Sequence, residues 1–443
     1  MIGCHTGRFF QVTVSGGSYQ EGLCAIVQGV PPGMLITEQE IYSFMLLRKP
    51  GADELSSPRK EPDLPVIFTG VNADDTIEGA GNRNRTNGTP LTVLIPNLDR
   101  HFEHVRQYQD TNRTPRPGHA SYASFMKYGP DDDAIGAGFF SGRYTAPVVA
   151  AGAVAGKILE KCGVKVFSFI KELAGVKSGA VDHDAAFSHA ANFKRMRRDY
   201  DPFYREIYMS GRVAPEMRFL EKMRVFAGIE KEIDAIRAKA PKVVPAEVRE
   251  KYGVHPVVNC PDLEAAGAML EACSRIAAAG DSAGGVIEVI VLGAPAGLGE
   301  PVFNKLDAEL ARMMGIGAVK GVEIGAGFAV RDMTGSENND QMRADDGKVI
   351  FESNNAGGVT GGLATGQPIV ARITVKPTPT INKPQRTIDK YTLENRELSA
   401  ITRRDPTIVA RIWPVAESCA AMTILDHLMA HYGYQELVRK VRE

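Results

Sequence analysis

The spacing of apolar positions predicts strands in the first hundred residues. Residues 8–30 contain two β-rich runs on either side of a glycine and serine turn at 16–19, which is a hairpin signal. Residues 66–98 contain two more β-rich runs, separated by a polar loop rich in glycine, asparagine and arginine. We expect that loop to be flexible.

Between these strands, residues 37–47 (TEQEIYSFMLL) carry an apolar stripe at helical spacing. Thr37 is a suitable N-cap, and Glu40 follows three residues later as in a capping box. The pattern predicts a short helix that delivers Arg48 and Lys49 at its C-terminal end.

Two later stretches predict helices of different character. Residues 146–160 are rich in alanine and valine, which suits a helix that packs very closely on its neighbours. Residues 183–258 are charged and helix-favouring, and their isoleucines at helical spacing predict one buried face (Ile229, Ile233 and Ile236). We interpret the basic run at residues 194–198 as a solvated helix face, because acidic residues are interleaved.

After residue 258, helical and extended patterns alternate. Helices are predicted near 262–279, 302–314 and 413–431, and strands at 286–293, near 317–331 and at 369–375. The whole pattern indicates an α+β fold.

Composition narrows the classes of function. The chain has 443 residues, 44% hydrophobic and 24% charged, with a net charge of −1, which argues against a general nucleic-acid binder. The six cysteines are scattered without metal-ligand spacing, so we expect free thiols and no metal site. No charged-then-apolar leader and no run of about 20 apolar residues is present, so we expect a cytoplasmic protein without a membrane partner.

Arg48, Arg116, Arg143 and Arg403 lie beside glycine, proline or aspartate in turn-like sequence. Guanidinium groups fixed in such settings suit a phosphate or carboxylate, which they bind through paired charge-assisted hydrogen bonds. Each alone is explained as well by a surface ion pair. Four together favour a site for an anionic small molecule.

Two other side chains are candidates for proton transfer. His119 follows Pro117 and Gly118 in RPGHASY, a turn that can aim the imidazole into a cavity, and its ordinary pKa lies near neutrality. Asp405 follows two arginines in RRDP, which would keep it ionised. Both residues could equally be structural, Asp405 as an N-cap or turn residue.

Two further segments suit a phosphate group. The glycine-rich residues 354–362 and the KPTPTI segment at 376–381 offer backbone N–H groups, a lysine and hydroxyls. Neither has the spacing of a dinucleotide-binding or nucleotide triphosphate loop.

Several strings in this order resemble the chorismate synthase family: RPGHASY, GDSAGG, PAGLGEPVFNKLDAELA, AVKGVEIGAGF, NNAGGVTGG, KPTPTI and RRDP. The resemblance implies a β-α-β sandwich, a single catalytic domain over 1–443 and a mainly helical insertion at about 183–258. It implies a carbon-oxygen lyase that uses reduced FMN, without net redox change, to eliminate phosphate from 5-enolpyruvylshikimate 3-phosphate and give chorismate. It also implies a cytoplasmic homotetramer, with NADPH only as an external reductant.

The same resemblance assigns roles by position. The catalytic set is His119, Asp405, Ser18, Tyr19 and Ser141, and the substrate-binding set is Arg48, Arg116, Arg143 and Arg403. The flavin-binding set is Ser141, Ala318, Gly361, Lys376, Thr378, Thr380 and Arg403.

The chain departs from the family at the site itself. Where the family has a histidine that donates a proton to the leaving phosphate, this chain has Tyr19. Glu54 takes the place of a family arginine, and Arg404 takes the place of a family histidine near the C-terminus. At the two positions before Ser141, where the family has an arginine and a serine, this chain has Phe139 and Phe140. Two interpretations of these rings are open: stacking near the flavin and ordinary packing in the core. Arg404 could offset the loss of the acid.

These substitutions leave three hypotheses about the function open. The chain is a chorismate synthase of full, reduced or altered activity, a paralogue that eliminates phosphate from another shikimate-type substrate, or a paralogue without turnover.

Overall fold

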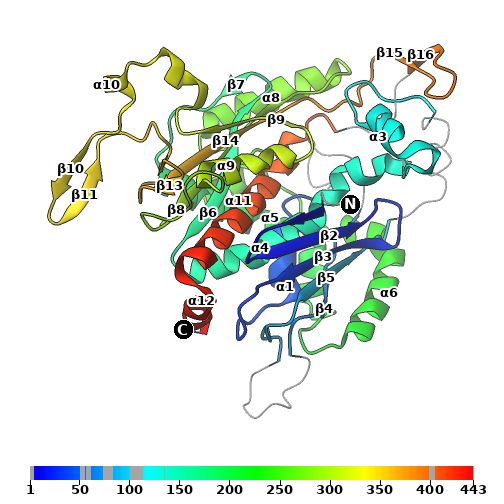
Figure 1. The fold of residues 1–443 in the computed structure, drawn as a ribbon. Helices are drawn as coiled ribbons and strands as arrows, with labels where there is room; N and C mark the ends of the chain where they lie inside the picture. The colour runs from blue at the N-terminus through cyan, green and yellow to red at the C-terminus, as the bar shows by residue number, and fades with distance from the viewer. Residues whose placement is uncertain are drawn as a thin grey trace.

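The computed structural model describes residues 4–49, 55, 61–72, 83–99, 113–133, 135–398 and 405–442. Two five-stranded antiparallel sheets form its framework (Figure 1). The first has the order β1 (His5–Thr6), β2 (Gln11–Gly16), β3 (Gly22–Gln28), β5 (Leu91–Pro96) and β4 (Val66–Thr69). The second has the order β7 (Val176–Lys177), β6 (Lys165–Leu173), β8 (Gly285–Leu292), β14 (Ile369–Val375) and β9 (Val319–Ile324).

Three two-stranded hairpins lie outside these sheets: β10 (Met342–Asp345) with β11 (Lys348–Phe351), β12 (Val359–Thr360) with β13 (Leu363–Ala364), and β15 (Gln385–Ile388) with β16 (Asn395–Leu398). The β10–β11 hairpin extends away from the body of the molecule (Figure 1).

Two long helices separate the sheets. Helix α4 (Thr145–Lys161) packs on the first sheet, α11 (Val409–Tyr432) packs on the second, and the two helices pack on each other. A Cβ atom placed on Gly152 of α4 would lie 2.1 Å from the Cβ of Ser418 on α11, so only glycine permits this approach. The structure thus confirms the predicted α+β sandwich and the close packing of the small-residue helix.

Shorter elements complete the fold: α1 (Glu38–Met45), α3 (Ser121–Tyr128), α8 (Leu263–Ala278), α9 (Leu306–Leu310), α10 (Gly335–Asn338), α12 (Tyr434–Arg442) and the 3₁₀ turns Gly129–Asp131, Ile135–Phe140, Gly142–Tyr144, Ala311–Gly315 and Gly327–Asp332. Helix α8 contacts β6 and β7 of the second sheet. A hydrophobic core of aliphatic and aromatic residues from both sheets fills the space around α4 and α11.

Local sequence determines where α1 begins. The side chain of Thr37 accepts a hydrogen bond from the Glu40 backbone, and the Glu40 carboxylate accepts one from Thr37, so the predicted capping box is present. Arg48 and Lys49 follow directly after its C-terminal turn, as predicted.

The segment 183–258 is mainly helical, as predicted, with α5 (His183–Tyr200), a π-helical turn (Tyr204–Met209), α6 (Phe219–Ala238) and α7 (Pro245–Tyr252). The three isoleucines of α6 are buried. The prediction of a wholly solvated basic face on α5 was wrong at one position. Lys194 turns inward and pairs with Glu417, a buried carboxylate of α11 that needs a counter-charge.

Two predicted elements are shorter in the structure. The helix expected at 302–314 begins only at Leu306 and changes to a 3₁₀ turn at Ala311. The strand expected near 317–331 ends at Ile324, where Gly325 adopts φ +60° and meets the backbone of Asn355 too closely for any other residue.

The described cysteines are all free, with Cys260 and Cys273 buried. Within the described ranges, every helix is too short or too polar to cross a membrane.

Candidate functional site

A cavity of about 1080 Å³ opens between α4, α11, the 311–320 segment and the turns around residues 116–120 and 139–144. It lies where the two halves of the sandwich meet. Of the predicted site residues, the structure places in its wall Arg48, Arg116, His119, Ser141, Arg143, Ala318, Lys376, Thr378, Thr380 and Asp405. These side chains come from positions up to 357 residues apart, so the predicted convergence is real for this set.

Two of the predicted arginines share one carboxylate at the base of the cavity. Arg48 Nη1 donates to Asp63 Oδ2 over 2.7 Å, and Arg143 Nη1 donates to Asp63 Oδ1. Glu61 Oε2 lies 2.9 Å from the same Arg143 nitrogen. Burial by itself would raise the pKa of Asp63, but the charges of Arg143 and Arg48 outweigh it and lower that pKa.

The backbone around Asp63 is held in an uncommon conformation. Its φ is +55°, a left-handed value that a residue other than glycine rarely adopts without compensation from its surroundings. The carboxylate of this same residue is bound by two guanidinium groups.

Arg143 also connects the cavity to the hairpin turn of the first sheet. Its Nε donates to Asn97 Oδ1 over 2.7 Å, and the amide nitrogen of Asn97 donates to the carbonyls of Gly17 and Gln20 over 2.9 and 2.7 Å. This chain fixes the guanidinium plane, which paired binding of an anion requires.

At another part of the wall Arg116 and His119 lie together on the turn that Gly118 makes with φ +71°. Arg116 Nη1 is 3.4 Å from Thr380 Oγ1, and Nη2 is 3.4 Å from His119 Nε2. His119 Nδ1 accepts the backbone N–H of Ser121 over 3.2 Å, so both ring nitrogens face N–H donors.

The structure corrects one expectation about His119. Burial, followed by the nearby charges of Arg116 and Lys376, lowers its pKa to about 3, well away from neutrality. In this state the imidazole is neutral at pH 7. An anion that offsets the two cations would raise the pKa again.

The KPTPTI segment continues this cationic surface. Lys376 Nζ donates to the Gly118 carbonyl, and the Lys376 backbone N–H donates to the Ala318 carbonyl over 2.9 Å. Thr378 Oγ1 donates to the Asp405 carbonyl over 2.7 Å. The segment thus joins the turn of His119 to the start of the C-terminal helix.

The carboxylate of Asp405 is paired with an arginine that the sequence did not suggest. Arg411 Nη1 lies 3.2 Å from Asp405 Oδ1, and its Nε donates to the Arg48 carbonyl over 3.0 Å. Arg411 occupies the first turn of α11, six residues after Asp405, which lies before the helix, so helical spacing does not pair the two residues in the sequence. Asp405 is not the N-cap of α11, which is Ile408.

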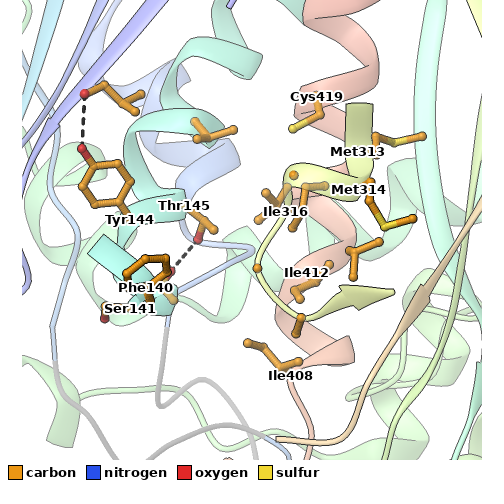
Figure 2. A pocket seen from close by; sticks show the side chains of 18 of the residues that line it. Phe140, Ser141, Tyr144, Thr145, Met313, Met314, Ile316, Ile408, Ile412 and Cys419 are labelled. Atoms are coloured by element: carbon orange, nitrogen blue, oxygen red, sulfur yellow. Dashed lines mark hydrogen bonds between the residues drawn. The ribbon is translucent and has the colours of Figure 1, made fainter. Parts of the chain in front are cut away.

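Another part of the cavity wall is apolar, and further charged side chains line the cavity at Glu309, Arg312, Lys320 and Asp426. Figure 2 shows Ile408, Ile412 and Cys419 of α11 beside Met313, Met314 and Ile316, opposite Phe140, Ser141, Tyr144 and Thr145. Burial raises the pKa of the Cys419 thiol to about 12, so it is a neutral, weakly polar part of this surface. The cavity therefore combines cationic, acidic and apolar regions.

Three positions named from the sequence lie around Ser141. Ser141 Oγ donates to Ser18 Oγ over 3.3 Å. Phe139 and Phe140 both line the cavity, and the Phe139 ring packs on Tyr144 at a centroid distance of 4.7 Å. Ser18 and Tyr19 are not among the residues that line the cavity, although Ser18 touches one that does.

Besides Ser18 and Tyr19, one further position named from the sequence does not line the cavity. Gly361 lies in the turn between β12 and β13 and is not a lining residue. Glu54, Arg403 and Arg404 lie outside the described residues.

Sequence reasoning missed the polar residues that hold the arginines, namely Glu61, Asp63, Asn97 and Arg411. Glu61 and Asp63 alternate with prolines in EPDLP, which is a local sign of a fixed turn but not of a charged partner. Within the described part of the chain, no three histidine, cysteine or acidic side chains are grouped as a metal site would require.

The sandwich fold encloses a cavity of small-molecule size with cationic and apolar side chains in its wall. Comparison with known proteins identifies one family. The chorismate synthase family model matches residues 10–429, so this chain belongs to the chorismate synthase family.

Relatives named chorismate synthase agree with this assignment. One from Acetivibrio thermocellus is 38% identical, over 99% of this chain and 97% of the relative. One from Methanosarcina mazei is 36% identical over 97% of both chains. A crystal structure of a chorismate synthase covers 98% of this chain and 97% of its own with a TM-score of 0.63, and at 24% identity it shows a shared fold.

Proposed function

We propose that this protein is a lyase that converts 5-enolpyruvylshikimate 3-phosphate to chorismate. The observation that carries the proposal is the convergence of Arg48, Arg116 and Arg143 on one cavity in a chain of the chorismate synthase family. A substrate with one phosphate and two carboxylates gives each guanidinium an anionic partner.

In this anti-1,4-elimination the C3–O bond to phosphate breaks with its electron pair and the C6 proton is removed, leaving a second double bond in the ring. The protein must therefore stabilise a departing phosphate and accept one proton. Arg116 and Lys376 lie together beside His119, and we assign the phosphate to them. We assign the carboxylates to Arg48 and Arg143, which requires them to share their charge between substrate and Asp63.

The cavity fits a reduced FMN. It is large enough for a flavin beside a small ring, since ligand pockets commonly measure about 300–1,000 Å³. Ile316, Ile408 and Ile412 offer an apolar face for the flavin ring, and Lys376, Thr378 and Thr380 offer polar contacts at its edge. When bound, the reduced flavin supplies electron density to the reacting ring and recovers it within one turnover.

The remaining proton chemistry falls to neighbouring side chains. The imidazole of His119 is neutral and lies beside Arg116, and arrival of a phosphate dianion favours the imidazolium form, which stabilises the leaving group. Asp405 is held close to Arg411, and Ser141 close to Ser18. We assign these residues to movement of the proton taken from C6.

The test is an anaerobic assay of the purified protein with reduced FMN and 5-enolpyruvylshikimate 3-phosphate. We expect phosphate and chorismate to be released in equal amounts. Absence of release at high enzyme concentration, with substrate binding intact, would contradict the proposal. In that case the related substrates of the shikimate type are the next to screen.

The domain organisation, the location in the cell and the oligomeric state are further proposals. We propose one catalytic unit, because both sheets contribute to one core and one cavity, and a cytoplasmic protein that receives reduced flavin from outside, with NADPH as a candidate reductant. We also propose a homotetramer. Exposed apolar side chains on and near the β10–β11 hairpin support subunit contacts, notably Phe328 (70% exposed) and Met342 (64% exposed), and light scattering coupled to gel filtration tests it.

A further inference from the structure

The helical segment 183–258 holds helix α1 at both of its ends. Near the N-terminus of α1, Glu38 Oε1 lies 2.7 Å from Lys222 Nζ of α6, and both side chains are buried. Just past the C-terminus of α1, Lys49 forms an ion pair with Asp201, the residue that ends α5. Both of these are buried as well.

The contacts of Asp201 make the second attachment rigid. Its Oδ1 accepts the backbone N–H of Tyr204 over 2.7 Å and the hydroxyl of Tyr42 over 3.1 Å, while Oδ2 takes the Lys49 ammonium. The ammonium also lies 3.3 Å from the Tyr42 hydroxyl and 4.7 Å from the centre of the Phe203 ring. Three donors, the Tyr204 backbone N–H, the Tyr42 hydroxyl and the Lys49 ammonium, thus hold the Asp201 carboxylate in one orientation.

Lys49 is adjacent in sequence to Arg48, yet the two side chains have different surroundings. Arg48 lines the cavity and binds Asp63, whereas Lys49 is not a lining residue and lies among the aromatic side chains of the helical segment. A displacement of the Lys49 backbone would therefore move the Arg48 guanidinium out of its plane with Asp63. Small misplacements of a binding group can cost about 10²-fold in rate.

We propose that the Asp201–Lys49 ion pair is a positioning device for Arg48, through which the helical segment 183–258 sets the affinity of the anion site. This inference rests on the proposed function in assigning a carboxylate of the substrate to Arg48. It gives the segment a role in substrate binding. Asp201 acts through Lys49 and Arg48 and touches no substrate itself.

The test compares Asp201→Asn and Lys49→Met, which remove opposite members of the pair, with Asp201→Glu, which keeps the charge. Binding of shikimate 3-phosphate is measured by calorimetry without flavin, and kcat and KM by anaerobic phosphate release. We expect Asp201→Asn and Lys49→Met to raise the Kd and KM about tenfold with kcat changed less than about threefold, and Asp201→Glu to recover most of the affinity. Using both sides of the pair keeps the test open if one variant does not fold.

A double-mutant cycle separates positioning from general loosening. Arg48→Lys keeps the positive charge but loses the planar fork, so in that background Asp201→Asn should add less than about a twofold effect on Kd. Lys222→Met is the matched control, because it removes the other buried ion pair of the same segment and should lower stability while leaving Kd unchanged.

Full additivity in the cycle, or an equal rise in Kd for Lys222→Met, would overturn the proposal. So would a wild-type protein that binds no shikimate 3-phosphate. A wild-type protein that binds this probe but releases no phosphate would overturn the proposed function alone, and the Kd comparison would still decide the role of Asp201.

Discussion

Arg48 donates to Asp63 over 2.7 Å inside the protein, with 1% of Arg48 and none of Asp63 exposed. Asp63 binds Arg143 as well, so a single carboxylate fixes two of the arginines that the sequence marked as anion-binding. The same contact is a source of stability and a competitor for the substrate. Replacing Asp63 therefore measures how much this contact contributes to stability.

We expect Asp63→Asn to lower the free energy of unfolding by about 3–5 kcal/mol, because it leaves two buried guanidinium groups without their shared carboxylate. Urea unfolding followed by circular dichroism measures the change. The matched control is Asp281→Asn, which breaks a partly exposed pair with Lys383 at 2.7 Å and should cost less than about 1 kcal/mol. Equal losses for the two variants would show that the Arg48–Asp63 contact contributes no more than a surface pair.

His119 should take up a proton when an anion binds. Its pKa is lowered to about 3 in the free protein by burial and by the charges of Arg116 and Lys376, and a bound phosphate offsets those charges. At pH 5.5 we expect binding of shikimate 3-phosphate to take up roughly half a proton more in the wild type than in His119→Gln. Calorimetry in buffers of different ionisation enthalpy measures this difference, and identical uptake in both proteins would contradict it.

The same residue affects stability as the pH falls. The ordinary pKa of histidine, 6.5, applies to the unfolded chain, so between pH 6.5 and about 3 the unfolded state binds more protons than the folded state. The contribution of neutral His119 is therefore complete above pH 6.5 and is lost progressively below it. His119→Gln should lose less stability than the wild type between pH 6.5 and 4, as followed by urea unfolding at each pH.

Gly152→Ala should destabilise the contact between α4 and α11. The added Cβ would lie 2.1 Å from Ser418, so the helices must separate, at a cost of about 1–3 kcal/mol. Gly156→Ala in the same helix is the control, since its Cβ meets no atom within 4 Å and alanine favours the helix by about 1 kcal/mol. Thermal unfolding should shift in opposite directions, and equal shifts would refute close packing at Gly152.

Tyr19→His should raise the rate of phosphate release. Tyrosine, with a pKa of about 10, is a poor acid at pH 7, and a well-placed general acid contributes about 10²–10⁴-fold. We expect an increase of at least about tenfold in anaerobic single turnovers, with Tyr122→His on the exposed face of α3 as the control. Because Tyr19 does not line the cavity in this structure, an unchanged rate would assign protonation of the leaving phosphate to His119.

Some features follow from neighbouring residues and could be predicted. The Thr37–Glu40 capping box, the β2–β3 hairpin and the buried face of α6 depend on contacts within a few residues, and all were found as expected. The family strings located part of the cavity wall, including Arg116, His119, Lys376 and Asp405. They could not identify Asp63 as the partner of Arg48 and Arg143, because charge partners distant in sequence leave no local pattern. Arg411 was missed because it is six residues from Asp405, outside helical neighbour spacing.

The sequence alone determined the elements, their periodicity and the chemistry of the arginines, since hydrogen bonding and capping within a segment depend on adjacent side chains. Only the tertiary structure decided which charges are shared and how far each is removed from water. Arg48 is therefore bound to Asp63, and Lys49, its neighbour, to Asp201. The pKa of His119 likewise falls because burial and two cations act on it together, which no local sequence encodes.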